Sequence, residues 1–269
     1  MRTLAFDRIE NARELGGIHV SDGRSVRAHR LIRSGNLSLA TDADIEILTR
    51  DFKLSDVVDF RFPAEADKDP DRIIPGVRYT KLSTLPQKFI DGFSQGRSEA
   101  GQLSSADFAA ALVHHAANPE AQELARQMYP GIVSDPVSQQ RYGEFLRVVL
   151  NAEGGVLWHC SQGKDRAGLA AAFVLTALGA GFEEILADFD ESNVSYTIQM
   201  NVLCKRVEDL GGGEDAKDFI RAMVGVSKPN FLRAVAWIEK TYGSLLNYVE
   251  QALGFGPQQQ KQLKDKYLR

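Results

Sequence analysis

The sequence has few cysteines and no long apolar segment, and these absences exclude several classes of protein. Its 269 residues contain two cysteines, Cys160 and Cys204, which are too few for a disulfide framework. No run approaches the roughly 20 apolar residues that a membrane-spanning helix requires. The stretch 1–17 lacks the apolar core and the cleavage site of a secretory signal peptide. We therefore expect a cytoplasmic protein without a transmembrane segment, and secretion without a recognisable signal stays open.

The sequence also lacks an excess of basic charge. A formal net charge of −4 and an isoelectric point near 5.8 argue against nucleic acid as the main partner. If the substrate is an anion, a local site must attract it, because the overall charge of the protein does not. A hydrophobic content of 43% is ordinary for a globular domain and is sufficient for a core.

Short apolar runs alternate with helical patterns along the first 160 residues. Apolar runs bounded by turn residues predict strands at 29–35, 54–61, 76–83 and 154–158. A helix that Thr41 or Asp42 caps is predicted between the first two strands, and an amphipathic helix over 138–152. From 183 onward the pattern is helical. We therefore predict an α/β fold in which helices cover both faces of a central sheet of a few mostly parallel strands.

One region departs from this alternation. The stretch 86–136 mixes glycine and serine with alanine-rich helical segments and contains no convincing strand. We interpret it as a helical lid inserted into a single domain that spans 1–269.

The stretch "HCSQGKDRAG" at 159–168 carries the strongest chemical signal. It follows an apolar strand and precedes a long apolar helix, so several backbone N–H groups and the positive end of the helix dipole point at one spot. Arg166 can donate two parallel N–H bonds to a phosphate. The same field would stabilise a thiolate at Cys160, which is a nucleophile. The alternative is that Cys160 is a small buried side chain at the end of a strand.

This stretch resembles the signature of the protein tyrosine phosphatase superfamily, in the "HCxxGKDRxG" form of a bacterial branch that includes secreted mycobacterial tyrosine and phosphoinositide phosphatases. Further segments are similar to that branch in the same order. They are "NARELGG" at 11–17, "RLIRSGNLS" at 30–38, "VVDFRFPAEADKDPDRI" at 57–73, "DFDESN" at 188–193 and "TYGSLLNYV" at 241–249.

The resemblance implies a phosphatase without a metal or other cofactor, acting on a phosphorylated protein or a phosphoinositide. Cys160 would form a phosphocysteine, Arg166 would clamp the phosphate, and His159 would orient the loop. The loop would also hold inorganic phosphate. The phosphate-binding residues would be Ser161, Gln162, Gly163, Lys164, Asp165 and Arg166.

The resemblance names Asp165 as the first candidate for the general acid, with Asp91 as the second. A helix-start carboxylate that offsets the dipole is the alternative for Asp165. Lys164 would add a second cation, suited to multiply phosphorylated substrates such as phosphoinositides, or would be a solvated lysine. Asp59 and Arg61 are expected to be structural and to pair with each other's neighbours, with Glu65 as a candidate partner.

One position departs from the family. Where relatives have threonine or serine after the arginine, this chain has Ala167, which places the breakdown of the phosphocysteine in doubt. Two other functions therefore stay open. One is a phosphate-binding module without turnover, and the other is a sulfurtransferase that forms a persulfide on Cys160.

Overall fold

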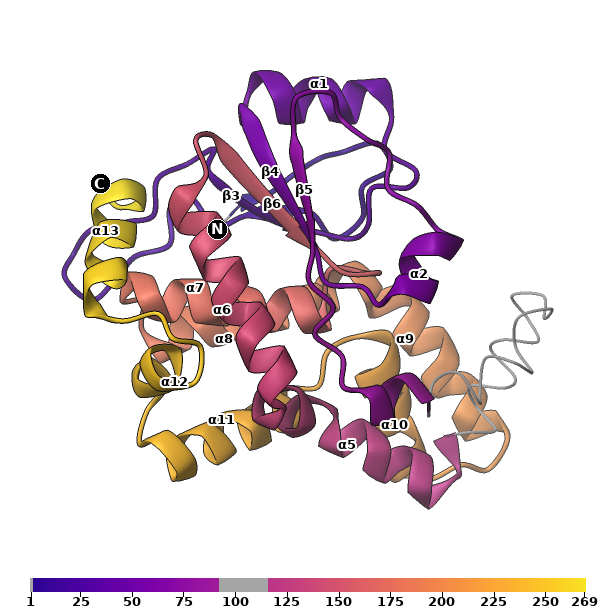
Figure 1. Ribbon diagram of the computed structural model, residues 1–269. Coiled ribbons are helices and arrows are strands. Elements are labelled where there is room, and N and C mark those ends of the chain that lie inside the picture. Colours follow the sequence, from indigo (N-terminus) through magenta and orange to yellow (C-terminus); the bar gives the residue numbers. More distant parts are fainter. Residues whose placement is uncertain (1, 92–115) are drawn as a thin grey trace.

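The computed structural model describes residues 2–91 and 116–269, which form a six-stranded sheet surrounded by helices (Figure 1). The strands are β1 (Arg2–Thr3), β2 (Arg13–Glu14), β3 (Leu31–Ser34), β4 (Leu54–Asp59), β5 (Arg78–Lys81) and β6 (Gly155–His159). Their order is β1-β2-β3-β6-β4-β5. The last four are parallel to one another, whereas β1 and β2 are antiparallel. The predicted, mostly parallel sheet is confirmed. The sequence did not predict β1 and β2, because two-residue strands are too short to show a pattern.

The described residues also form a set of helices. They are α1 (Asp42–Arg50), α2 (Pro63–Lys68), α5 (Pro119–Ser134), α6 (Pro136–Asn151), α7 (Asp165–Leu178), α8 (Phe182–Asp190), α9 (Ser192–Asp209), α10 (Glu214–Val224), α11 (Lys228–Tyr242), α12 (Leu245–Gln251) and α13 (Pro257–Tyr267). Of the two residues predicted to cap α1, Thr41 is the cap, because its side chain accepts a hydrogen bond from the Asp44 N–H. Helix α6 begins two residues before its predicted start, because Asp135 caps it and Pro136 occupies its first turn.

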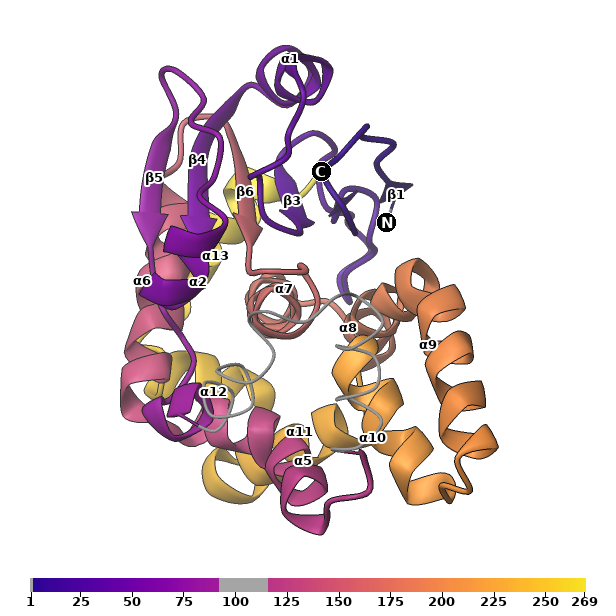
Figure 2. The same ribbon diagram turned by 90° about the vertical axis from the view of Figure 1, so that its right-hand side faces the viewer.

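Successive side chains of the central strands pack on opposite faces of the sheet. Val57 of β4 and Leu157 of β6 belong to the apolar cluster that includes Leu48 of α1. Their neighbours Val58 and Trp158 belong to the larger cluster formed with α6 and α7. Figure 2 shows α1 on one side of the strands and α7 on the other. Helices therefore cover both faces, as the sequence predicts.

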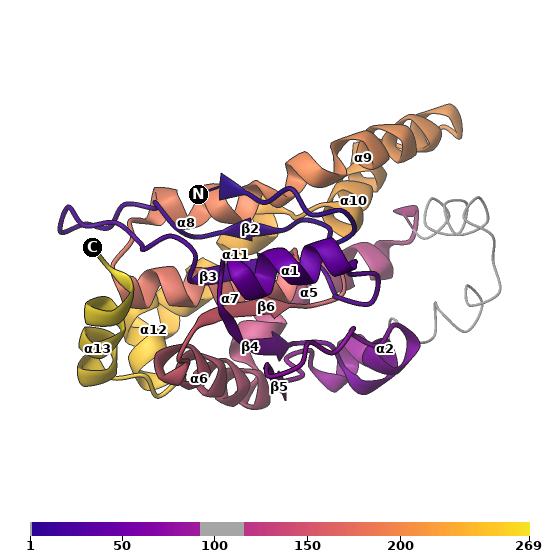
Figure 3. The ribbon, with the colours of Figure 1, turned by 90° about the horizontal axis from the view of Figure 1, so that it is seen from above.

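Helix α7 is buried along its whole length, apart from its first residue. Every residue from Arg166 to Leu178 is shielded from solvent. The helix contacts β3, β6, α6, α8, α12 and α13. Gly179 ends it in the left-handed conformation, at φ +89°. Seen from above, α7 runs under the sheet between α8 and α6 (Figure 3). The segment before α7 is therefore attached to a rigid support.

A separate apolar cluster joins α5, α9 and α10, with Ala125, Leu203 and Phe219 among its buried members. Part of the predicted lid, 92–115, lies outside the described residues. Its described parts contain a helical turn at 87–91 and the whole of α5. None of the helices within 2–91 and 116–269 combines the length and the apolar character needed to cross a membrane.

Candidate functional site

The loop between β6 and α7 lies at the centre of the carboxyl edge of the sheet. Strand β6 is flanked by β3 and β4, and all three run in the same direction. The segments that follow β3 and β4 therefore lie on either side of the loop 160–164. Ligands of parallel α/β sheets bind at this edge.

The first carbonyl groups of the loop point outward, toward polar side chains. The Ser161 carbonyl accepts hydrogen bonds from the backbone N–H and from Nδ2 of Asn36, at 3.2 and 3.0 Å. The Gln162 carbonyl accepts from Asn11 Nδ2 and from the Tyr196 hydroxyl, both at 3.0 Å. Three separate segments of the chain thus hold this half of the loop.

Arg33 holds the second half of the loop from β3. Its Nη2 donates to the carbonyls of Gly163 and Lys164 at 2.8 and 2.9 Å, and its Nη1 contacts Asp188 Oδ2 at 2.5 Å. Arg13 donates from Nε to the other oxygen of Asp188 at 3.0 Å. Burial and the charge of Arg13 lower the pKa of Arg33 to about 10. Burial alone would raise the pKa of Asp188, but the two arginines lower it. Arg33 and Asp188 therefore both stay ionised at neutral pH.

With the carbonyls directed outward, the amide groups of the loop are left for a ligand. Within 2–91 and 116–269, none of the N–H groups of residues 161–164 donates a hydrogen bond. Helix α7 begins without a side-chain cap, so its first N–H groups are also unused by side chains. A tetrahedral oxyanion matches this arrangement of donors at the positive end of a helix.

Gly163 is the one loop position where only glycine fits. Its φ is +70°, in the region that side chains disfavour. A Cβ atom there would lie 2.2 Å from the carbonyl carbon of Ser34 and 2.5 Å from the nitrogen of Gly35. The glycine lets the loop pass directly against the end of β3.

Arg166 is oriented by a buried carboxylate from α2. Its Nη1 and Nη2 contact the two oxygens of Glu65 at 2.6 and 3.0 Å. Glu65 also accepts a hydrogen bond from the Ser161 hydroxyl at 2.8 Å. Burial lowers the pKa of Arg166, but Glu65 and a thiolate at Cys160 outweigh it and raise the pKa overall. This bidentate pair fixes the plane of the guanidinium group.

Asp165, the first candidate for the general acid, opens α7 and is partly exposed. The hydroxyl of Tyr129, from α5, donates a hydrogen bond to Asp165 Oδ1. Burial and the charge of Asp165 raise the pKa of Tyr129 well above its usual value, so the phenol keeps its proton. Asp91, the second candidate, is exposed and accepts a hydrogen bond from Gln87, on a different segment from the loop.

His159 connects the segment of Cys160 to a buried charged group. Its Nδ1 lies 3.1 Å from the carbonyl of Cys160, and its Nε2 lies 3.1 Å from Asp71 Oδ2. Arg61 bonds both Asp59 and Asp71, with Nη2 distances of 2.9 and 2.8 Å. Asp59 and Arg61 therefore pair directly with each other, in keeping with the structural role expected of them. The donor atoms of Asp59, Asp71 and His159 lie close enough to hold a metal ion, but such an ion would have to displace the Arg61 guanidinium.

The ammonium group of Lys164 does not face the loop's interior. It donates hydrogen bonds to the backbone carbonyls of Met223, Val224 and Gly225, at the end of α10. Burial lowers the pKa of Lys164, and the charges of Asp165 and Cys160 partly offset this effect. The sequence suggests a second cation for the substrate or a solvated lysine, and the structure has neither arrangement.

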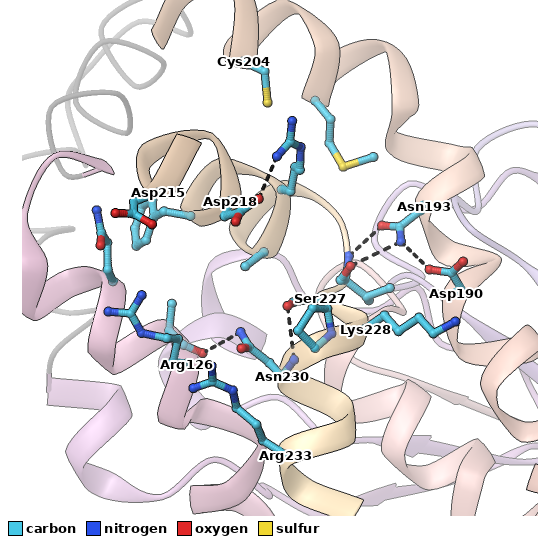
Figure 4. A pocket seen from close by; sticks show the side chains of 18 of the residues that line it. Arg126, Asp190, Asn193, Cys204, Asp215, Asp218, Ser227, Lys228, Asn230 and Arg233 are labelled. Carbon is cyan, nitrogen blue, oxygen red and sulfur yellow. Dashed lines mark hydrogen bonds and ion pairs between the residues drawn. The ribbon is translucent and has the colours of Figure 1, made fainter. Parts of the chain in front are cut away.

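Ala167 and Cys204 do not lie on the side of the loop where the amide groups are left for a ligand. Ala167 is completely buried, and its carbonyl accepts a hydrogen bond from Trp158 Nε1 at 3.1 Å. Cys204 borders a cavity of about 600 Å³ between α5, α9, α10 and α11 (Figure 4). Among the described residues that line this cavity, none belongs to 159–167. The cavity is therefore distinct from the space above Cys160.

Several residues of the site were not assigned to it from the sequence. Their acidic, amide and phenol groups come from segments distant in the chain. They are Glu65, Asp188, Asn36, Tyr129 and Tyr196. Asn36, Glu65 and Asp188 lie inside family-like segments, which was the one sequence signal that pointed to them, whereas Tyr129 and Tyr196 lie outside those segments.

Comparison with known proteins gives a consistent result. The profile of the tyrosine phosphatase family matches residues 4–269. A Cupriavidus necator chain named as a tyrosine-protein phosphatase is 33% identical over 255 residues, 93% of this chain and 84% of the relative. The triple specificity protein phosphatase PtpB of Mycobacterium tuberculosis is 28% identical over 247 residues, 85% of this chain and 87% of PtpB. The solved structure of P. aeruginosa TpbA covers 78% of this chain and 88% of TpbA, with 17% identity and a TM-score of 0.29.

Proposed function

The chain belongs to the tyrosine phosphatase family and is a phosphatase, and we propose that it hydrolyses phosphotyrosine monoesters through a phosphocysteine on Cys160. The arrangement of the loop 160–166 carries this proposal. Its carbonyls are bonded on the outside, its amides are left for an oxyanion, and Arg166 is held in a fixed plane beside them.

The reaction has two steps. In the first, the Cys160 thiolate attacks phosphorus, the P–S bond forms and the ester P–O bond breaks. Asp165 gives its proton to the departing oxygen, so the alcohol or phenol leaves neutral. In the second step water attacks phosphorus, its proton passes to Asp165, and the thiolate departs with release of inorganic phosphate. The loop amides and Arg166 stabilise the charge that develops on the equatorial oxygens in both steps.

The Tyr129 hydroxyl supports the assignment of Asp165. It fixes one carboxyl oxygen at the start of α7, and the other lies 3.9 Å from Lys164 Nζ. A positioned acid contributes about 10²–10⁴-fold to such a reaction. His159 acts through the Cys160 carbonyl and is therefore a positioning residue.

Phosphotyrosine is the first substrate class to test, because the family and the relatives are named for it. Phosphoserine, phosphothreonine and phosphoinositides are further candidates, since the relative PtpB is named for triple specificity. A binding module without turnover is the second candidate function. Ala167 favours it, because a buried methyl group supplies no hydroxyl for breakdown of the phosphocysteine.

The test is rapid-mixing hydrolysis of p-nitrophenyl phosphate with reductant and EDTA. We expect sustained turnover in the wild type and none in Cys160→Ser. Cys204→Ser is the matched control, because it removes the other thiol at a site remote from the loop, and it should retain wild-type turnover. A single burst without turnover would favour the binding module, and full activity of Cys160→Ser would refute the proposal.

A further inference from the structure

The Lys164 ammonium group uses all of its N–H donors in its contact with the end of α10. The Lys164 side chain is only 6% exposed, and its Nζ lies 2.9 Å from the Val224 carbonyl and 3.0 Å from the Gly225 carbonyl. The Met223 carbonyl is its third acceptor. An ammonium group has three N–H donors and no acceptor. All three donors are therefore engaged, and none remains for a substrate.

The three acceptors are well suited to hold a cation. They belong to the last two residues of α10 and to its C-cap residue Gly225, where carbonyls have no partner within the helix. The negative end of the helix dipole adds to the attraction. Lys164 thus caps α10 although it is distant from α10 in sequence, and the contact joins the loop to this helix.

The end of α10 is itself held in place by α9. Asn193 accepts a hydrogen bond from the Val226 N–H at 2.8 Å and donates to the Val226 carbonyl at 3.2 Å. Gly225 packs so closely on this side chain that a Cβ atom would lie 2.2 Å from Asn193 Oδ1. The acceptors of Lys164 are therefore fixed by a neighbouring helix and do not simply follow the lysine.

We infer that Lys164 positions the phosphate-binding loop by tying it to the end of α10, and that its ammonium group does not contact the phosphoryl groups of the substrate. This inference rests on the proposed phosphatase function. Arg166 is then the one side-chain cation of the loop that faces the bound phosphoryl group. A neighbouring second phosphate finds no matching cation on the loop, so a polyphosphorylated inositol gains no extra affinity there.

The competing explanation makes a different prediction. If Lys164 swung toward the substrate, its removal would reduce the hydrolysis of a polyphosphate much more than that of a monophosphate. If it positions the loop, its removal affects both substrates equally, because both use the same amides and Arg166. The ratio of the two activities is thus more informative than either activity alone.

The experiment combines two substitutions at the two ends of the contact. Lys164→Met removes the ammonium group, and Gly225→Ala displaces its acceptors without altering the lysine. Each variant and the double variant are assayed with p-nitrophenyl phosphate and with inositol hexakisphosphate. Lys217→Met on α10 and Gly213→Ala at its N-cap are the matched controls. Within 2–91 and 116–269, the ion pair of Lys217 is with the exposed Glu214, and a Cβ at Gly213 meets no atom within 4 Å beyond its chain neighbours.

We expect each single variant to lose about 10- to 100-fold in kcat/KM, the cost of a displacement on the order of 1 Å in a catalytic group. The loss should be equal for both substrates within about twofold, and the double variant should lose no more than the worse single one. The controls should match the wild type. Selective loss of inositol hexakisphosphate hydrolysis in Lys164→Met, or additive losses in the double variant, would overturn the inference.

A binding measurement separates this inference from the proposed function. Titration calorimetry measures the binding of inorganic phosphate to the loop even if the wild type shows no turnover. Binding without turnover would refute the phosphatase mechanism and leave the inference about Lys164 standing. Lys164→Met and Gly225→Ala should then weaken phosphate binding by the same factor. If Lys164→Met does not fold, Gly225→Ala and its control Gly213→Ala still test the inference. Unchanged phosphate binding in Gly225→Ala would contradict the tie between the loop and α10.

Discussion

Replacing Glu65 with glutamine tests how the buried pair with Arg166 supports the loop. The substitution keeps the shape of the side chain but removes its charge, and it leaves Arg166, which is 9% exposed, without its carboxylate partner. Removing one partner of a buried ion pair costs about 3–5 kcal/mol in the free energy of unfolding. We expect about 3 kcal/mol, because glutamine retains one acceptor oxygen.

This loss converts into a measurable change in the melting temperature. For a chain of this size, 1 kcal/mol corresponds to about 2–4 °C, so Glu65→Gln should melt roughly 6–12 °C below the wild type. The plane of Arg166 is also released, and we expect kcat/KM for p-nitrophenyl phosphate to fall on the order of 10²-fold. Glu46→Gln is the control. Glu46 forms an exposed ion pair with Arg50, which contributes less than about 1 kcal/mol.

The pH dependence of the difference supplies a second, independent readout. Burial raises the pKa of Glu65, but Arg166 and the Ser161 hydroxyl outweigh it and lower the pKa overall. The carboxylate therefore contributes stability at neutral pH that is lost as the pH falls below its ordinary value of about 4.3. The gap in melting temperature between wild type and Glu65→Gln should narrow over this range. Equal melting temperatures at pH 7, or a gap that does not change with pH, would refute the reasoning.

Three further outcomes are expected. Gly163→Ala should weaken inorganic phosphate binding at least about tenfold in titration calorimetry, because its Cβ collides with the backbone after β3; unchanged affinity would mean that the loop adopts another path. Asp165→Asn should reduce kcat for phenyl phosphate by about 10²-fold and for p-nitrophenyl phosphate by less, because the better leaving group needs less protonation; equal losses would remove Asp165 as the acid. Lowering the pH from 6 to 3 should destabilise the protein in urea titrations, because charged partners lower the pKa of Asp71 and Asp188 as well as that of Glu65; stability that rises toward pH 3 would contradict this account.

Local patterns in the sequence were sufficient for the parallel sheet and for the frame of the site. The apolar runs predicted β3, β4, β5 and β6, and the spacing of Cys160 and Arg166 between a strand and an apolar helix predicted the loop. These features depend on neighbouring residues, so a local pattern reveals them. The hydrogen bonds that hold the loop carbonyls outward do not come from residues that are close in the sequence. They require Asn11, which lies 151 residues before Gln162, and Tyr196, which lies 34 residues after it.

Lys164 shows a second limit of sequence reasoning. Its acceptors are backbone carbonyls, and every residue type has one, so no residue type marks the position where a buried ammonium group finds its partners. The sequence therefore offered a cation for the substrate or a solvated lysine. Only the three-dimensional path of α10 distinguishes these possibilities from a buried cap.

The hydrogen bonds around the loop also determine when it can acquire its shape during synthesis. Its contacts come from Asn11, Arg33, Tyr196 and the end of α10 at 223–225. A nascent chain that has emerged only as far as α7 holds the complete signature, Asn11 and Arg33, but lacks Tyr196 and the end of α10. The loop shape for which we propose phosphate binding therefore arises late, after more than four-fifths of the chain has left the ribosome.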